Sequence, residues 1–370
     1  MSSRVTVALC AAALALAAPA AVAKELVFGS WVSPQHGVNK SLEQFFKDVE
    51  AETKGSLTWK MLAGGQMVDS RSTLAGIKDK LIDAGIIIPV FTRRELRASN
   101  TLQDMANYGH DAVAVGGSAT ETVMMHCPEC QKEYRDNNAV FLGGYQLTNY
   151  YLICASPITT IAAVKGKKVR AVGAQSRLAR DMGAVPVSLP PDEGVQAMQR
   201  GALDCIIGAI AWLESFGYMD VAKSIVDYPL GNARALGLVV MNRSTWQSLA
   251  VDQRKAMMKH MGSATARAII NGYIKEDERL IAEAKKKGIQ FTKGGADFDE
   301  LMKRHLESEE KAIPAAMKQL GLADPESIMR AHVALNPKWE KIAGEVGQDI
   351  DKYAAALNRE IYDKIDVTKY

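Results

Sequence analysis

The order of apolar runs, glycines and polar turns across residues 164–212 predicts a strand–helix–strand–helix–strand unit. The short apolar run at 169–172 lies between glycines, which is typical of a buried strand. Residues 186–189 alternate weakly and are expected to form the second strand. Residues 203–212 form a nearly continuous apolar run, the pattern of a strand that is covered on both faces.

The two helices of this unit have recognisable ends. We expect one helix over 176–182, closed by Gly183 in a left-handed conformation. A second is expected from Asp192, as the N-cap, to Gly201. Strands that are joined by helical crossovers predict a parallel sheet, and ligands of such sheets bind at the carboxyl ends of the strands.

The first part of the chain has the same organisation. Strands are predicted at 25–31, 57–62 and 82–90, and helices at 39–54 and 72–80. Further elements are expected at 91–107 (helix), 119–137 (helix), 140–142 (strand), 148–155 (strand), 235–242 (strand), 245–287 (helix), 289–292 (strand), 297–320 (helix), 325–334 (helix) and 337–361 (helix).

Two distant segments share one helix–strand pattern. Around Asp83 and again around Asp204, apolar residues three apart on a helix are followed by an aspartate at the start of a buried strand. Two copies of a β–α–β device in a chain of 370 residues predict two similar α/β lobes. The strands at 148–155 and 235–242 are expected to cross between these lobes.

The N-terminus predicts export. Arg4 is followed by an apolar stretch and by Ala21-Val22-Ala23, so we interpret residues 1–23 as a signal peptide. No later stretch reaches about 18 apolar residues, so we expect a soluble protein of the periplasm. A net charge of +3 without a basic block gives no indication of nucleic-acid binding.

Four cysteines follow the predicted signal peptide, and an exported chain permits disulfides. Cys127-Pro-Glu-Cys130 is compatible with a local disulfide, with reduced thiols, with a redox pair or with half of a zinc site. A zinc site needs a second pair at similar spacing, which the sequence lacks, so no metal site is predicted.

Several short motifs occur in a characteristic order. They are S-P-Q-H-G-V-N-K at 33–40, G-G-Q-M at 64–67, V-K-G-K-K-V-R-A at 164–171, M-G-A-V-P-V at 182–187, D-E at 192–193, A-M-Q-R-G-A-L-D at 197–204 and N-R-S-T-W-Q-S-L at 242–249. Together they resemble the DctP-type substrate-binding proteins of tripartite ATP-independent periplasmic (TRAP) transporters.

The resemblance implies a fold and a function. The implied fold is α/β, a two-lobe periplasmic binding protein-like fold of type II, with crossing strands and a long helix linking the lobes. Lobe I would comprise 24–148 and about 236–275, and lobe II 149–235 and about 276–370. The family has no catalytic activity or cofactor, and it delivers small organic acids to membrane permease subunits. Service to a sensor and a periplasmic thiol-redox enzyme are the alternatives.

Arg170 matches the family's arginine that clamps the ligand carboxylate, and a planar guanidinium suits that task. The alternative for Arg170 is a salt bridge to Asp204. The family's ligand-binding asparagine is replaced by Gly208, and Trp212 lies in an apolar neighbourhood where it would stack on a ligand or simply pack in the core. This departure favours a monocarboxylate with an apolar or aromatic body, or an amide-like ligand.

Five further candidates are weaker. Gln66 in the G-G-Q turn and His36 in the first loop are expected near the ligand, with local turn or surface roles as alternatives. Tyr150 and Tyr151 lie on a predicted crossing strand, where alternation allows only one of them to face the cleft. Glu193 lies in the first turn of a helix, where its charge also suits the helix dipole.

Overall fold

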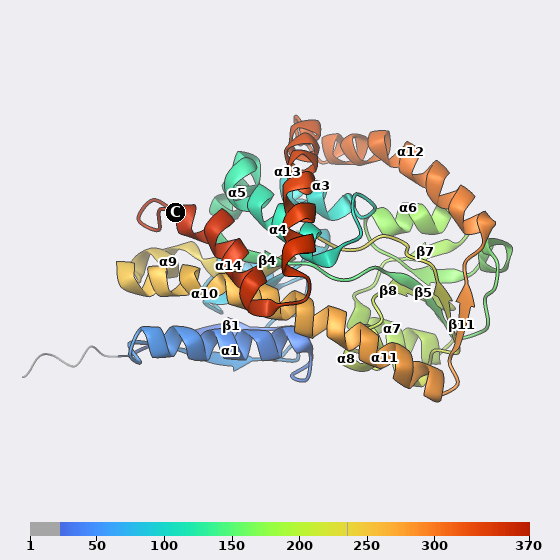
Figure 1. The fold of residues 1–370 in the computed structure, drawn as a ribbon, viewed down its shortest axis with the longest axis horizontal. Helices are drawn as coiled ribbons and strands as arrows, with labels where there is room; N and C mark the ends of the chain where they lie inside the picture. Colours follow the sequence, from blue (N-terminus) through green and yellow to red (C-terminus); the bar gives the residue numbers. More distant parts are fainter. Residues whose placement is uncertain (1–22, 235) are drawn as a thin grey trace, which may run out of the picture.

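The computed structural model describes residues 23–234 and 236–370, so the predicted signal peptide lies outside the described residues except for Ala23. The strands form two sheets, one in each half of the molecule (Figure 1). The strands are β1 (Lys24–Gly29), β2 (Leu57–Leu62), β3 (Ala84–Ile87), β4 (Ala139–Tyr145), β5 (Tyr151–Cys154), β6 (Lys168–Arg170), β7 (Val185–Val187), β8 (Cys205–Gly208), β9 (Ser224–Asp227), β10 (Leu236–Asn242) and β11 (Gln290–Lys293).

The α-helices are α1 (Gly37–Glu52), α2 (Thr73–Lys78), α3 (Arg97–Asp104), α4 (Ala112–Glu121), α5 (Pro128–Asp136), α6 (Ala174–Asp181), α7 (Pro191–Gln199), α8 (Trp212–Ser215), α9 (Arg243–Ser248), α10 (Val251–Ile269), α11 (Lys275–Lys286), α12 (Ala296–Gln319), α13 (Pro325–Val346) and α14 (Ile350–Glu360). Short 3₁₀ turns are η1 (Pro89–Phe91), η3 (Ile161–Val164), η4 (Tyr218–Asp220) and η6 (Tyr362–Lys364), and π-helical turns are η2 (Thr122–His126) and η5 (Ile270–Ile274).

The first sheet, sheet A, has the strand order β2-β1-β3-β10-β4. β1 pairs in parallel with β2 and β3, whereas β10 is antiparallel to both of its neighbours. The second sheet, sheet B, has the order β11-β9-β5-β8-β6-β7, and β6, β7 and β8 are parallel as predicted. Each sheet therefore contains one interior strand that runs against its neighbours, β10 in sheet A and β5 in sheet B.

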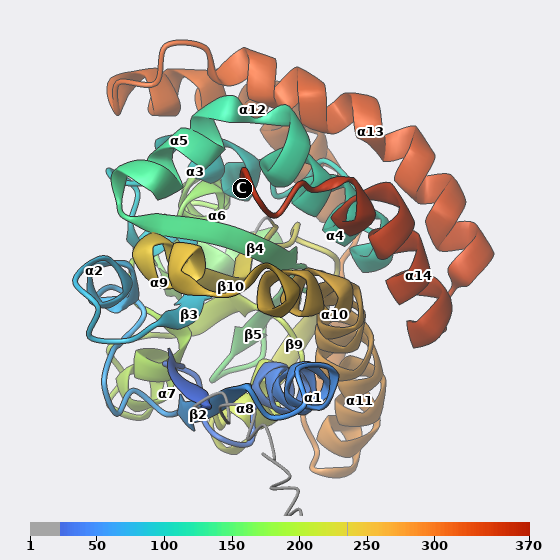
Figure 2. The ribbon, with the colours of Figure 1, turned by 90° about the vertical axis from the view of Figure 1, so that its left-hand side faces the viewer.

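The chain passes between the sheets along two adjacent segments, 146–150 and 230–234. Tyr150 N–H donates to Gly231 O at 2.6 Å, and Leu230 N–H donates to Tyr150 O at 2.8 Å. A long helical run, α10–η5–α11, also spans both halves and descends from the left to the lower right of Figure 1. Helices α12 and α13 arch over the opposite side, which Figure 2 shows from the sheet A end. The lobe boundaries given above stay a prediction.

Several predicted boundaries were wrong for local reasons. Pro190, not Asp192, occupies the N-cap of α7, and Asp192 lies in its first turn. The apolar run at 203–212 is a strand only to Gly208, because the chain then turns into α8. Cys127 begins α5 instead of lying inside one long helix, since the π-helical η2 ends just before it.

The C-terminal helices and one strand also differ from the prediction. Helix α13 continues through Pro337, where the pattern had predicted a break. The buried Trp339, just beyond the proline, donates its indole N–H to Glu121 Oε2 at 2.6 Å and keeps this part of α13 against α4. Strand β9 had no counterpart among the predicted elements, although its pairing with β5 and β11 completes sheet B.

Candidate functional site

A narrow cavity lies between the two sheets, at the carboxyl ends of β1 and β6. Its volume is about 30 Å³, which is room for one or two water molecules. Its lining residues come from both halves and from the crossing segments: Trp31, Val32, His36, Ile88, Val90, Phe91, Gln103, Tyr145, Leu147, Tyr150, Arg170, Val172, Gln175, Pro191, Trp212, Phe216, Ala233 and Tyr273. Arg170 is the only Lys, Arg, Asp or Glu among them.

Arg170 is the last residue of β6 and is 2% exposed. Its Nε donates to Leu189 O at 2.7 Å, and its Nη1 contacts Ile207 O at 3.4 Å. Within the described chain it forms no ion pair, and burial lowers the pKa of the guanidinium. The alternative pairing with Asp204 is wrong, because Asp204 instead accepts from Lys168 N–H at 2.8 Å and lies 3.6 Å from Lys167 Nζ. The buried positive charge thus has no directly bonded acidic partner among the described residues, although the charge of Asp192 still acts on it.

Aromatic rings supply much of the cavity wall. Trp31, after β1, stacks on Phe216, after α8, with ring centroids 6.2 Å apart and an interplanar angle of 7°. The rings of Tyr150 and Trp212 lie 5.2 Å apart. The Arg170 guanidinium lies 5.2 Å from the Trp212 ring centroid, where a cation–π attraction partly replaces its hydration. The cavity therefore combines one cation with flat apolar surfaces.

His36 lies at the N-terminus of α1 and is buried, not exposed on a loop. Its Nδ1 accepts from Val38 N–H at 3.2 Å. Burial, followed by the charge of Lys40, lowers the pKa of His36 to about 4, so the ring is neutral near pH 7. With Nδ1 acting as acceptor, the proton must be on Nε2. His36 is thus a neutral N–H donor in the cavity wall.

Gly208 lies on β8 beside the cavity instead of lining it. A Cβ atom at this position would lie 2.3 Å from the Trp212 ring. The Trp212 ring therefore occupies the space that a side chain at position 208 would need.

The other sequence candidates are separated from the cavity. Gln66 is exposed on its turn, and Tyr151 faces a different surface hollow, whereas its neighbour Tyr150 lines the cavity. Glu193 pairs with Arg71 at 2.8 Å, with side chains 44% and 51% exposed. This ion pair joins α7 of the sheet B half to the loop before α2 of the sheet A half.

Sequence reasoning missed Phe216, Tyr273 and Gln103 in the cavity wall. Tyr273 lies in the π-helical turn η5, where the long helix departs from its regular period and the face of a residue cannot be read from spacing. Phe216 follows the short helix α8, which was not predicted; only its first residue, Trp212, fell within a predicted element, the strand at 203–212. Gln103 lies inside a predicted helix. It faces the cavity that Arg170 also lines only because distant segments pack together. No sequence signal points to any of the three.

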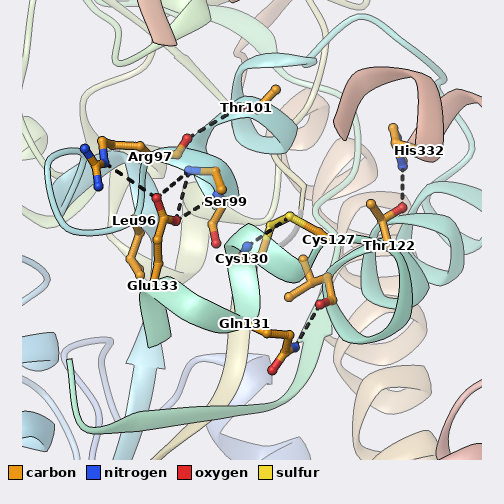
Figure 3. The surroundings of a disulfide bond; sticks show 12 residues. Leu96, Arg97, Ser99, Thr101, Thr122, Cys127, Cys130, Gln131, Glu133 and His332 are labelled. Carbon is orange, nitrogen blue, oxygen red and sulfur yellow. Dashed lines mark hydrogen bonds and ion pairs between the residues drawn. A yellow bond between two sulfur atoms is a disulfide. The ribbon is translucent and has the colours of Figure 1, made fainter. Parts of the chain in front are cut away.

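The four described cysteines form two disulfides, Cys127–Cys130 and Cys154–Cys205. The second joins opposite positions on β5 and β8 inside sheet B. Figure 3 shows the first, which is buried beside the start of α3. There the carboxylate of Glu133 accepts from Ala98 N–H at 2.8 and 2.9 Å. Neither disulfide lines the cavity. Among the described residues no His, Cys, Asp or Glu cluster is suited to hold a metal ion.

A family model agrees with this architecture over most of the chain. The model for bacterial extracellular solute-binding proteins, family 7 (DctP), matches residues 28–312. The chain belongs to the DctP family. The predicted membership and the α/β two-lobe fold class are thereby confirmed, and the family is one of extracellular receptors for solutes.

Solved structures of TRAP solute-binding proteins share the fold of this DctP-family chain. One from a marine metagenome, specific for aromatic acid ligands and in complex with 3-hydroxybenzoate, has a TM-score of 0.76 at 18% identity, covering 86% of this chain and 99% of that one. One from Rhodoferax ferrireducens T118, with copurified benzoate, has a TM-score of 0.75 at 20% identity, with the same coverage of 86% and 99%. At such identities the likeness shows the fold alone.

A curated relative shares part of the DctP-family sequence. The outer membrane transporter protein TsaT of Comamonas testosteroni is 29% identical over 138 residues, which are 36% of this chain and 40% of that protein. The chain thus spans less than half the length of this relative. Among the helices that the structure describes, none has the length and apolar character required to span a bilayer.

Proposed function

We propose that the protein captures an aromatic monocarboxylate in the cavity between its two sheets and delivers it to the membrane permease of a TRAP transporter. The carboxylate would pair with Arg170, and the ring would lie among the aromatic side chains. Aromatic monocarboxylates are a subset of the small organic acids with an apolar body that the sequence predicts as ligands.

The unpaired charge of Arg170 is the observation that carries this proposal. A fully buried charge is costly unless it meets a counter-charge, and no acidic side chain lines the cavity. A ligand carboxylate would supply that counter-charge and two acceptor oxygens for the guanidinium. The N–H of His36 Nε2 is suited to a further bond, because a neutral donor stabilises an anion without adding a second buried charge.

The walls of the cavity support a flat ligand body. Trp31, Tyr150, Trp212 and Phe216 offer ring faces and edges, which pack well against another ring. Two structurally similar proteins are described with 3-hydroxybenzoate and with benzoate. Both are single-ring monocarboxylates, in agreement with the chemistry of the lining.

Capture would require the two halves to separate. A volume of about 30 Å³ does not admit a benzene ring, so the stacked Trp31 and Phe216, which belong to opposite halves, must part before a ligand enters. The ligand would then favour the closed arrangement because it contacts both halves. The permease would take the ligand when the halves open again.

We infer no catalytic role for the chain. A thiol-redox enzyme needs an accessible reactive sulfur, whereas Cys127 and Cys130 are both buried. Their disulfide lies where η2 meets α5 and is suited to fixing that junction.

Titration of the purified, ligand-free protein with benzoate and with its neutral analogue benzamide tests the proposal. We expect benzoate to bind and benzamide to bind at least a hundredfold more weakly. Arg170→Met should weaken benzoate binding by roughly the same factor, because a buried charge pair contributes about 2–5 kcal/mol to such contacts. Arg180→Met, an exposed arginine on α6, is the matched control and should leave the affinity unchanged. Equal binding of both analogues, or an unaffected Arg170→Met variant, would contradict the proposal.

A further inference from the structure

The cavity contains a hydrogen-bond acceptor that a simple carboxylate ligand leaves without a partner. Gln103, on α3, lines the cavity and is 5% exposed. Its Oε1 is buried and has no hydrogen-bond donor among the described residues. A buried acceptor without a donor costs about 1–3 kcal/mol, so this oxygen is expected to acquire a donor in the loaded protein.

An ionised carboxylate cannot satisfy this oxygen. Its two oxygens only accept hydrogen bonds, and they match the donors of Arg170. A second orphan in the same wall is the buried indole Nε1–H of Trp31, which has no acceptor in the described chain. A hydroxyl group is the smallest substituent that both donates and accepts, so it has the chemistry to satisfy either group.

We propose that Gln103 is a specificity-determining residue, and that the preferred ligand is an aromatic monocarboxylate carrying a ring hydroxyl that donates to Gln103 Oε1. This inference rests on the proposed function, since it assigns the second polar contact of the same ligand. A site that hydrogen-bonds a ligand hydroxyl discriminates against the analogue that lacks it, because the buried protein group is then left unpaired.

The experiment compares dissociation constants for benzoate, the three hydroxybenzoate isomers and 3-methoxybenzoate, measured by calorimetry. We expect one hydroxybenzoate isomer to bind about tenfold or more tightly than benzoate. Methoxybenzoate keeps the ring oxygen but lacks the donor hydrogen, so it should gain nothing over benzoate. Equal affinities for benzoate and all hydroxybenzoates, or an equal gain from the methoxy compound, would overturn the inference.

Variants assign the effect to Gln103. Gln103→Met keeps the side-chain length and removes the amide, so the variant should bind the preferred hydroxybenzoate and benzoate with about equal affinity. Gln146→Met is the matched control, because Gln146 is also fully buried with an unpartnered Oε1 but does not line the cavity. It should retain the preference. A preference that survives in Gln103→Met would overturn the assignment.

The two proposals fail in different ways. If no aromatic acid binds, or if Arg170→Met binds benzoate normally, the proposed function is wrong. If benzoate binds through Arg170 but the hydroxyl brings no gain, only the role of Gln103 is wrong.

Discussion

Two arginines, the buried Arg170 and the partly buried Arg177, have opposite surroundings. Arg177, on α6, donates from Nε and Nη2 to both carboxylate oxygens of Glu309 at 2.6 Å, and from Nη1 to Asp104 Oδ2 at 3.1 Å. Arg170, at the end of β6, contacts two backbone carbonyls and a tryptophan ring. The acids raise the pKa of Arg177 above its usual value, whereas desolvation lowers that of Arg170.

The difference indicates that Arg177 stabilises the fold, whereas Arg170 is available to bind a ligand. Arg177 ties α6 to α3 and α12, and Arg93 completes the network with two bonds to Asp104 at 3.0 and 3.1 Å. Every charge in that network has an opposite partner within the chain. Around Arg170 the described chain supplies rings and carbonyls, and the one acid whose charge acts on it, Asp192, forms no ion pair with it. A ligand carboxylate would therefore be its first directly bonded counter-charge.

The largest expected effect is on stability, at Arg177. Arg177→Met leaves Glu309 buried without its cation, and breaking a buried pair in this way costs about 3–5 kcal/mol. We expect a corresponding decrease in the free energy of unfolding, measured by chemical denaturation without ligand. The double variant Arg177→Met/Glu309→Gln should recover part of the loss, because it also removes the orphaned charge.

Arg170→Met sharpens the contrast in the same experiment. The substitution removes a buried charge that forms no ion pair with an acid. The free energy of unfolding of the ligand-free protein should therefore change by less than about 1 kcal/mol or increase. If Arg170→Met destabilised the ligand-free protein as much as Arg177→Met, the distinction between the two arginines would be lost.

The pH dependence of stability tests a buried acid that, unlike the acids beside Arg177, has no cation as a partner among the described residues. Asp277, in the first turn of α11, accepts from Ala211 N–H at 2.6 Å, directly before Trp212. Burial, outweighing this bond, raises the pKa of Asp277 from 3.8 to about 7. The folded state therefore binds a proton that the unfolded state has released, and stability falls as the pH rises from about 4 to about 7. The full shift corresponds to roughly 4 kcal/mol at most.

Asp277→Asn isolates this contribution, because Glu133 also has its pKa raised by burial to about 7 and gives the same sign. As the pH rises from about 4 to about 7, we expect the Asn variant to become progressively more stable relative to the original protein, measured as the difference in the free energy of unfolding. If Asp277 were instead paired with a cation in the folded protein, its pKa would be depressed, and the original protein would gain stability relative to the variant as the pH rises.

The sequence predicted those parts of the site that local pattern determines. Glycine-flanked apolar runs and helix periods located β6, α6 and β8 closely enough to place Arg170 on a strand, and the structure places it at the end of that strand. The alternation along β5 was sufficient to expect Tyr150 and Tyr151 on opposite sides. The cysteine count indicated that disulfides were permitted but gave no pairing for Cys154 and Cys205, which lie 51 residues apart.

The remainder depends on contacts between distant segments. Asp204 pairs with Lys167 and not with Arg170 because the register between β6 and β8 places it beside the first residue of β6, whereas Arg170 is the last. The acids that serve Arg177 come from α3 and α12, 73 and 132 residues away in the chain. Gln103 and Phe216 join the cavity in the same way, through the packing of the two halves, which neither periodicity nor motif records.

A smaller effect is expected where the two halves meet through aromatic rings. Phe216→Leu removes the stack on Trp31 and the edge contact with Trp212, whose ring centroid lies 5.7 Å from that of Phe216. Aromatic pairs contribute about 0.5–1.5 kcal/mol each, so benzoate affinity should fall about two- to tenfold. Phe291→Leu on β11 is the control and should leave the affinity unchanged. An unaltered affinity in Phe216→Leu would mean that the aromatic rings around Arg170 do not contribute to ligand binding.

The smallest effect is expected at the exposed ion pair between Arg71 and Glu193. Both side chains are about half exposed, so their pairing contributes about 0–1 kcal/mol and is screened by salt. Because the pair joins the two halves, Glu193→Gln should weaken ligand affinity by less than about fivefold in dilute buffer, and the difference should vanish near 1 M salt. Calorimetry at two salt concentrations measures this. If Glu193 instead contacted the ligand, as one interpretation of the sequence allows, the loss would persist in salt, and Arg170 would no longer be the only charged side chain that recognises the ligand.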